Sequence, residues 1–170
     1  DNGTLALDNI FLAIQRGEVY SLLGPNGEGK TTLFSLITNF IKSTSRQIYF
    51  QQENTTISYC PQENILWPFL SVIDHLKIFS FLRGKSLNAK DAFDLLKTVQ
   101  LQHKAGTKVN TLSGGMKRRL SLAISLAGDA QLILLDEPTS GLDSRKRREI
   151  WEIIRSLNRK RTFLLSTHMM

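Results

Sequence analysis

Apolar and polar positions along the chain follow two periods, and together they predict an α/β fold built on a parallel sheet. Short, mostly apolar runs occur at residues 19–23, 56–60, 132–135 and 162–166. Continuous apolar runs of this length are typical of parallel strands buried inside a domain. The segments between them place apolar residues every three or four positions, which is the helical period.

Four amphipathic segments predict helices. Ser71 with Asp74 forms a capping-box pattern at the start of one, and Asn88 with Asp91 forms an N-cap pattern at the start of another. Ser113 is a favourable N-cap for a further helix. The apolar positions expected to face the core are Leu33, Leu36, Ile37 and Phe40, then Val72, Leu76, Phe79 and Leu82, then Ala92, Leu95, Leu96 and Val99, and finally Ile150, Ile153, Ile154 and Leu157.

In the N-terminal region apolar and polar residues alternate with the two-residue period of a strand. Residues 5–14 alternate in the way expected of a half-buried strand, and residues 47–51 predict a second short strand. After Pro61 and Gln62 the composition changes to a block of helices, which we interpret as an inserted subdomain.

Composition excludes several classes of protein. With 170 residues, 41% apolar and 22% charged, the chain has the size and composition of about one folded domain. No run approaches the ~18 apolar residues that a membrane span needs. The lone Cys60 rules out an internal disulfide, and its apolar neighbours predict a buried core thiol.

The net charge of +7 permits anionic partners but does not identify one. Basic runs at 117–119, 145–148 and 159–161 lie on or beside predicted helices. Aromatic residues are not interleaved with them, so we interpret these runs as solvated helix faces. His75 and His103 are expected on exposed helix faces, without a role.

Residues 24–32, with the sequence GPNGEGKTT, fit the phosphate-binding pattern G-x-x-x-x-G-K-[ST] between a strand and a helix. Glycines let several backbone N–H groups converge on one anion, and the helix N-terminus adds partial positive charge. Lys30 would supply a point charge for phosphate and Thr31 an oxygen for Mg²⁺. The weaker alternative is a glycine-rich turn that binds nothing.

Two later segments also carry chemistry. Asp136 and Glu137 follow the apolar run 132–135, where an unpaired buried charge would be unfavourable unless a metal or ligand compensates. Ligands of open α/β sheets bind at the carboxyl ends of the strands. Ser113 and the two glycines after it predict a capped helix N-terminus, which is itself an anion site.

Taken together, five motifs make the chain resemble the nucleotide-binding domain of ABC ATPases over essentially its whole length. The motifs are residues 24–32, Gln62, LSGGM at 112–116, LILLDEP at 132–138 with SGLD at 140–143, and His168. The A subfamily is the most similar, because of LSGGM, YCPQEN around Gln62 and STHMM at the end. The G subfamily, which shares PTSGLDS, is second.

The resemblance implies a P-loop NTPase (RecA-like) fold: a parallel-sheet core with a small N-terminal antiparallel β part and an inserted α-helical subdomain. The core would comprise residues 1–62 and 108–170, and the helical subdomain about 65–105. The family's adenine-stacking aromatic lies upstream of this sequence, and Ser45-Arg46-Gln47-Ile48 replaces the usual S-G-x-I. We therefore expect a fragment of a larger protein.

The resemblance also implies roles for individual residues. Glu137 would act as general base, His168 would contact the γ-phosphate, and Gln62 would assist catalysis while completing a Mg²⁺ site with Thr31 and Asp136. The residues that would hold ATP are Gly24, Pro25, Asn26, Gly27, Glu28, Gly29, Lys30, Thr31 and Thr32. The residues that would contact the ATP of a facing domain are Leu112, Ser113, Gly114, Gly115, Met116 and Asp143.

The implied partners are a second ABC nucleotide-binding domain, arranged head to tail in the same or another chain, and transmembrane domains of the full-length protein. The domain would lie at the cytoplasmic face of a membrane and drive transport, of lipids by subfamily, with no nucleic acid expected. The alternative is a soluble ABC ATPase acting on ribosomes or nucleic acid, which only the basic runs support. Residues 33–111 are too few for an inserted DNA-repair coiled coil, and the intact motifs disfavour a degenerate regulatory half.

Overall fold

A parallel β-sheet organises the chain, and the computed structural model describes residues 6–8, 10–44, 48–50, 55–157 and 161–168. Within these ranges four strands form one sheet in the order β1-β4-β3-β2, and every pairing is parallel. The strands are β1 (Val19–Leu23), β2 (Ile57–Cys60), β3 (Leu132–Leu135) and β4 (Thr162–Thr167). The predicted α/β class and core strands are therefore confirmed.

The two central strands explain the continuous apolar runs, because β3 and β4 are buried along their whole length. Alternate residues enter different cores: Ile133, Leu135, Phe163 and Leu165 enter the larger one, and Leu132, Leu134 and Leu164 the smaller one. Strand β1 is only half-buried, with Leu23 47% exposed. Its predicted burial is wrong because, among the described residues, it has a neighbouring strand on one side only.

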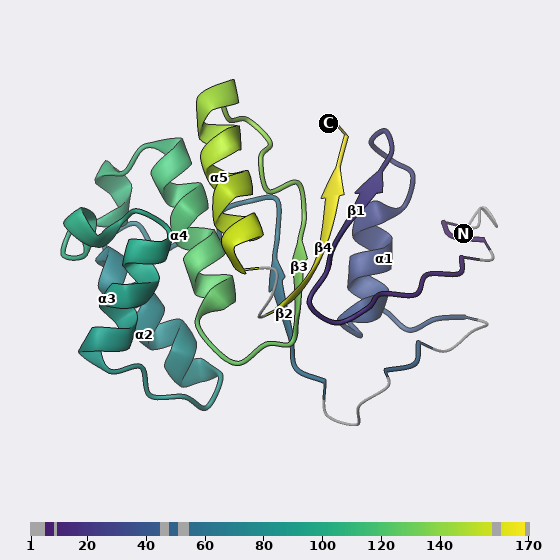
Figure 1. Cartoon of the computed structure of the whole chain (residues 1–170), viewed down its shortest axis with the longest axis horizontal. Helices are drawn as coiled ribbons and strands as arrows, with labels where there is room; N and C mark the ends of the chain where they lie inside the picture. Colours follow the sequence, from purple (N-terminus) through teal and green to yellow (C-terminus); the bar gives the residue numbers. More distant parts are fainter. Residues whose placement is uncertain (1–5, 9, 45–47, 51–54, 158–160, 169–170) are drawn as a thin grey trace.

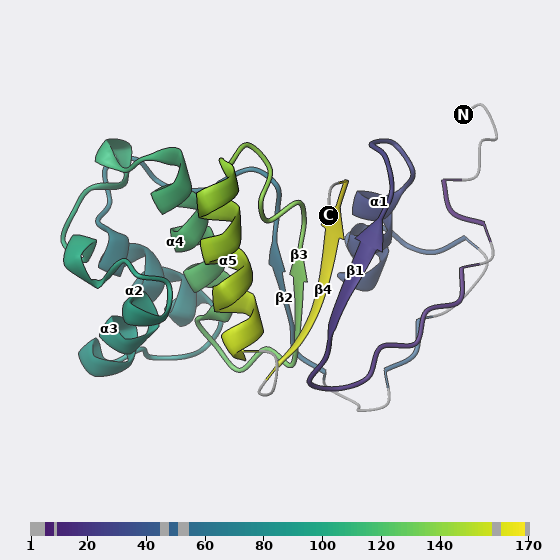
Figure 2. The same cartoon turned by 45° about the horizontal axis from the view of Figure 1, so that its top comes forward.

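Helices cover both faces of the sheet (Figure 1). Helix α1 (Lys30–Ile37) lies on one face and places Phe34 and Ile37 in the smaller core. Helices α4 (Gly114–Leu126) and α5 (Ser144–Leu157) lie on the other face, as the turned view also shows (Figure 2). The predicted isoleucine face of α5 is buried in the larger core.

Helices α2 (Val72–Leu82) and α3 (Ala89–Thr98) lie beyond α4, on the side away from the sheet (Figures 1 and 2). Two short 3₁₀ turns, η1 (Gln102–Lys104) and η2 (Val109–Thr111), lead back to α4. The buried apolar residues of α2 and α3 join the larger core. No helix in the described part of the chain is long and apolar enough to cross a membrane.

The predicted caps of these helices are confirmed. The Ser71 hydroxyl accepts a hydrogen bond from the Asp74 amide, and the Asp74 carboxylate accepts one from the Ser71 amide, which completes a capping box. The Asn88 side chain accepts from the Asp91 amide at 2.8 Å. Each cap satisfies backbone donors that the first turn of a helix leaves free.

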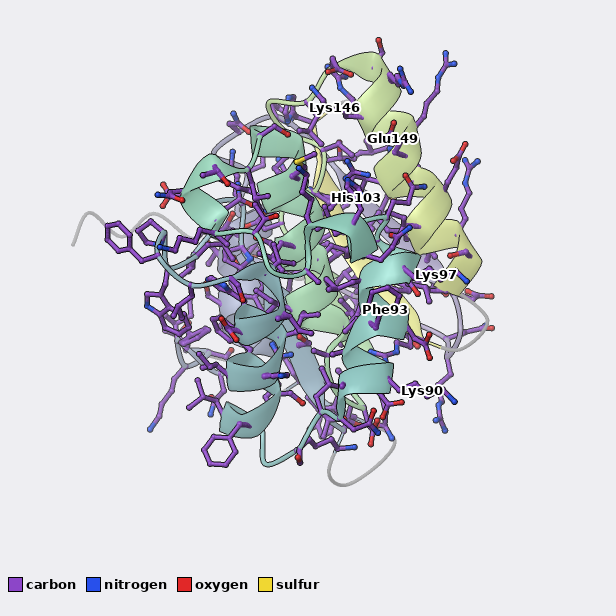
Figure 3. All side chains as sticks on the ribbon, turned by 90° about the vertical axis from the view of Figure 1, so that its left-hand side faces the viewer. Lys90, Phe93, Lys97, His103, Lys146 and Glu149 are labelled. Carbon is purple, nitrogen blue, oxygen red and sulfur yellow. The ribbon has the colours of Figure 1, made fainter. Side chains whose placement is uncertain are left out.

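One histidine prediction is correct and one is wrong. His103 lies on the outer surface together with Lys90, Phe93 and Lys97 of α3 (Figure 3). His75 is fully buried in α2, where its Nε2 accepts from the Trp67 amide at 2.9 Å and its Nδ1 lies 2.8 Å from the Ser71 carbonyl oxygen. Both ring nitrogens are therefore used structurally.

The predicted N-terminal antiparallel part is not formed by the described residues. Neither 6–8 and 10–16 nor 48–50 form a strand, while Leu5, Gln47 and Gln51 lie outside the described residues. Ile10, Phe11 and Leu12 are 48%, 84% and 42% exposed. An alternating segment becomes a strand only with a pairing edge and a layer that covers its apolar face.

The helix after the phosphate-binding loop is also shorter than predicted. Helix α1 ends at Ile37, and Asn39 has φ 59, a left-handed conformation common just after a helix end. Phe40 is 76% exposed, so its predicted place on the apolar face is wrong. The prediction that Cys60 is a buried core thiol is confirmed.

Candidate functional site

The loop at residues 24–29 joins β1 to α1 in the strand–loop–helix arrangement that its sequence predicts. Gly27 and Gly29 have φ values of 90 and 86, which residues with a Cβ rarely adopt. A Cβ on Gly29 would also lie 2.7 Å from the Ala6 carbonyl oxygen. Glycine is therefore required at position 29 by both conformation and space.

The first turn of α1 directs its polar side chains toward the loop and the end of β3. The Lys30 Nζ donates to the carbonyl oxygens of Gly24 at 2.5 Å and Pro25 at 2.8 Å. The Thr31 hydroxyl donates to Asp136 Oδ2 at 2.9 Å. These contacts place a cation and a hydroxyl beside the carboxyl ends of β1 and β3.

A cavity of about 170 Å³ lies at this place. Its lining residues are Asn26, Gly27, Gly29, Lys30, Thr31, Thr32, Gln62, Asp136 and Glu137. All nine are predicted site residues. A larger cavity of about 370 Å³ lies at the amino ends of the strands, beside Gly17, Gln131 and Thr162, and contains none of the predicted site residues.

Asp136 is 2% exposed, and its carboxylate is surrounded by hydroxyl donors. Oδ2 accepts from Thr31 and from the Tyr59 hydroxyl at 3.1 Å, while Oδ1 accepts from the Ser166 hydroxyl at 2.5 Å. Burial and the nearby Asp136 charge raise the pKa of Tyr59 well above its usual range. Tyr59 and Ser166 were not predicted as site residues, because their contacts with Asp136 depend on tertiary structure.

Glu137 is held by two contacts, and one of its carboxylate oxygens has no partner among the described residues. Its backbone has φ 45, and its amide donates to the Ser166 hydroxyl at 2.9 Å. His168 Nδ1 lies 2.8 Å from Glu137 Oε2. Glu137 Oε1 is buried without a hydrogen-bond partner among the described residues. This oxygen can therefore accept a hydrogen bond from a water molecule or a ligand in the cavity.

The oxygen donors of the cavity fit Mg²⁺. No group of three or more His, Cys, Asp and Glu side chains in the described ranges could hold a metal alone. Mg²⁺ usually binds through one or two carboxylates together with substrate phosphates and water. Thr31, Gln62 and Asp136 line the same cavity and offer hard oxygen ligands of this kind.

Residues 112–116 form the start of α4 and lie apart from this cavity. Ser113 is the N-cap, and its hydroxyl accepts from the Met116 amide at 3.3 Å, so the predicted cap is confirmed. A Cβ on Gly115 would lie 2.7 Å from Lys146 Cδ. None of residues 112–116 lines the cavity, so the structure does not bring them to the phosphate-binding loop of their own chain.

Asp143 fixes the start of α5 beside this helix terminus. Its Oδ1 accepts from the Lys146 amide at 2.9 Å, and its Oδ2 pairs with Lys146 Nζ at 2.6 Å. Hydrogen bonds from Lys146 lower the pKa of Asp143. Lys146, labelled on α5 in Figure 3, thus lies between Asp143 and Gly115. It was not predicted, although its position three residues after a capping Asp is a local signal.

The interpretation of residues 117–119 as a solvated face is wrong for the middle residue. Arg118 is 4% exposed, and within the described residues its guanidinium donates to backbone carbonyl groups alone. The signal for its burial was the helical period, since position 118 lies one turn before the buried Leu122. The positive charge of Arg118, taken alone, predicted a solvent-exposed position.

Comparison with known proteins agrees with this arrangement. The family described as "ABC transporter" matches residues 7–140. The mouse "ABC-type organic anion transporter ABCA8B" is 40% identical over 175 residues, which cover 98% of this chain and 11% of the relative. The human "Retinal-specific phospholipid-transporting ATPase ABCA4" is 35% identical over 179 residues, or 99% of this chain and 8% of the relative. The chain thus spans about a tenth of the length of these relatives.

Among solved structures, the dimeric post-hydrolysis state of the ATP-binding cassette MJ0796, bound to ADP and Pi, is similar to this chain. The TM-score is 0.81 and the sequence identity 28%, over 96% of this chain and 80% of that structure. The described fold is therefore that of an ATP-binding cassette.

Proposed function

The chain belongs to the ABC transporter family, as an A-subfamily-like ATP-binding domain with the family's ATPase activity, and we propose that it works as one half of an ATP-closed pair. In this pair the phosphate-binding loop of one domain and residues 112–116 of the other enclose each ATP. Closing and reopening the pair would move transmembrane domains of the full-length protein.

One observation carries this proposal. The cavity contains the phosphate-binding loop and both acidic residues, but it contains none of residues 112–116. Ser113 nevertheless caps an exposed helix N-terminus with glycine after it, which is a surface suited to an anion. A second copy, or a related domain placed head to tail, would bring this surface to the open side of the cavity. The dimeric state of the similar cassette supports the pairing of two such domains.

Within the cavity, the polar groups fit ATP hydrolysis. Lys30 would exchange its bonds to loop carbonyl oxygens for bonds to phosphate oxygens. Mg²⁺, held by Thr31, Asp136 and Gln62, would supply positive charge to the phosphates when bound. Glu137 would accept the hydrogen bond of the attacking water through its unpartnered Oε1, as a general base does.

His168 would orient this base and contact the γ-phosphate. Its Nδ1 lies at hydrogen-bond distance from Glu137 Oε2. With a proton on Nδ1, a neutral ring presents Nε2 as an acceptor. Nε2 can therefore donate to a phosphate oxygen only when the ring carries both protons, which would link γ-phosphate contact to the charge of His168.

The proposed whole protein is a membrane transporter with this domain at the cytoplasmic face. Residues 1–62 and 108–170 would form its ATP-binding core, and about 65–105 the helical subdomain facing the transmembrane domains. The name of one relative describes phospholipid transport, which supports a lipid cargo, whereas another relative is named for organic anions. An amphipathic anion such as a phospholipid is compatible with both names. The matched family and the relatives do not favour the ribosome or nucleic-acid alternative.

The test is ATP-dependent association of the Glu137→Gln variant, which should bind ATP without turning it over. Analytical ultracentrifugation with Mg-ATP should give a dimer, and Mg-ADP should give a monomer. Adding Ser113→Arg should abolish the dimer, because a long cationic side chain would occupy the proposed interface. A monomer at saturating Mg-ATP, or a dimer unaffected by Ser113→Arg, would contradict the proposal.

A further inference from the structure

Arg118 occupies an unusual place for a charged side chain. It lies in the second turn of α4, five residues after Ser113, and is 4% exposed. No salt bridge joins it to a carboxylate in the part of the chain that the structure describes. A buried charge of this kind is retained only where hydrogen bonds compensate for lost hydration.

Four backbone carbonyl groups provide this compensation. Nη1 donates to the carbonyl oxygens of Pro61 at 2.6 Å and Gln62 at 3.1 Å. Nη2 donates to the Asp136 carbonyl oxygen at 2.7 Å, and Nε to that of Pro138 at 3.0 Å. A single planar guanidinium therefore connects the Gln62 loop, the turn at residues 136–138 and the helix that begins at residues 113–116.

These bonds do not involve the side chains that line the cavity. Arg118 contacts the main chain of Gln62 and Asp136, so the side chains of both residues remain free to line the cavity. One helical turn later, the Ser121 hydroxyl donates to Asn64 Oδ1 at 3.0 Å, a second link between α4 and the Gln62 loop. The same face of α4 thus holds the loop at two points.

We propose that Arg118 is a positioning residue that makes the Gln62 loop, the 136–138 turn and the start of α4 move as one unit. The inference rests on the proposed function, since the start of α4 would contact the ATP of the facing domain. A shift of α4 as the pair closes would be transmitted to Gln62 and to the acidic residues of its own cavity. Each domain's cavity would then respond to the ATP that its α4 covers.

A matched control lies at the other end of the same helix. Arg83 is more exposed than Arg118, and its Nη1 donates to the carbonyl oxygens of Ile124 and Ala127, near the end of α4. Arg83 does not line the cavity, and its contacts with α4 lie at the end of that helix and not at its start. Arg→Lys keeps the positive charge at either position but removes the planar fork that binds several acceptors at once. Arg83→Lys therefore reports the structural cost of losing such a fork.

The experiment compares Arg118→Lys with Arg83→Lys in the intact protein, by steady-state ATPase kinetics and thermal unfolding. We expect both variants to lose thermal stability, with the larger loss in Arg118→Lys because Arg118 is buried. Only Arg118→Lys should also have about a 100-fold lower kcat, with a nearly unchanged KM for ATP, since a misplacement of about 1 Å has this effect. In a Gln62→Ala background the effect of Arg118→Lys should shrink, because both changes act on one unit. If Arg118→Lys does not fold, Arg118→Gln, which retains two N–H donors, takes its place.

Three outcomes would overturn the inference: equal kcat for both lysine variants, full additivity with Gln62→Ala, or failure of both Arg118 variants to fold. Loss of ATP-dependent association in the Glu137→Gln protein with Arg118 intact would contradict the proposed function instead. The two failures are thus distinguishable.

Discussion

At the scale of single residues, Glu137 carries the greatest conformational constraint in the site. Its φ of 45 is unfavourable for a residue with a side chain, and the proline that follows restricts its backbone further. The Ser166 hydroxyl and His168 hold it in this conformation. Local strain of this kind persists where the surrounding structure fixes it, and here it directs a buried carboxylate toward the phosphate-binding loop.

Replacing Glu137 by glutamine keeps the size and most contacts of the side chain but removes its basicity. We expect ATP turnover to fall by about 10²–10⁴, the usual contribution of a general base, while ATP affinity stays within a few-fold of the unchanged protein. Phosphate release and equilibrium nucleotide binding measure the two quantities. Turnover near the original rate would show that Glu137 is not the base.

Cys60 gives the chain a pH dependence that is independent of catalysis. Burial raises the pKa of its thiol, with the nearby Arg118 opposing the shift. Because the native pKa lies above the unfolded one, the contribution to stability is complete below the unfolded pKa and is lost as pH rises toward the native pKa. At one unit above the unfolded value near 8.5, the loss reaches up to about 1.4 kcal/mol.

Urea unfolding at pH 7.5 and pH 9.5 measures this effect. The unfolding free energy should decrease between the two pH values, and Cys60→Ala should reduce the decrease, although the smaller side chain lowers stability at both. Tyr59, whose pKa is also raised, adds to the decrease at higher pH. An equal decrease in both proteins would assign the effect to other groups.

At the scale of elements, local patterns predicted what local interactions determine. The caps at Ser71, Asn88 and Ser113 are contacts within four residues, so their sequence signals were sufficient. The burial of His75 and Arg118 was missed because it depends on contacts with backbone groups of other segments. The N-terminal strands were predicted from alternation and their antiparallel pairing from the family resemblance, and neither supplies a pairing edge in this chain.

The capping box of α2 offers a prediction that separates stability from catalysis. Ser71→Ala removes the acceptor for the Asp74 amide and should lower the unfolding free energy by about 1 kcal/mol. The KM and kcat for ATP should not change, because α2 does not line the cavity. Ser156→Ala, which removes only a hydroxyl bonded to the Ile153 carbonyl oxygen within α5, should have a smaller effect. A larger loss for Ser156→Ala, or a change in kcat for Ser71→Ala, would contradict this account.

At the scale of the whole molecule, the motifs are divided between two surfaces. The parallel sheet gathers the phosphate-binding loop, Gln62 and the acidic residues at the carboxyl ends of its strands, as the cavity lining shows. Residues 112–116 lie at the N-terminus of α4 and do not line this cavity. The order of the motifs along the chain does not reveal this division, and only the family resemblance implied that residues 112–116 contact the ATP of a facing domain. The division gives the proposed pair its strictest test.

That test mixes two inactive variants. Lys30→Ala would disable the phosphate-binding loop, and Ser113→Arg the surface proposed to face the partner. When either variant pairs with itself, both sites would therefore carry one defect. In a mixed dimer, one site collects both defects and the other collects none. Because Ser113→Arg should weaken association, mixed dimers are isolated through a different affinity tag on each variant. They should have about half of the original ATPase rate if the two sites act independently, since one of their two sites is intact. A mixture in which mixed dimers are detected by differential tags but activity stays at the level of the separate variants would exclude shared sites.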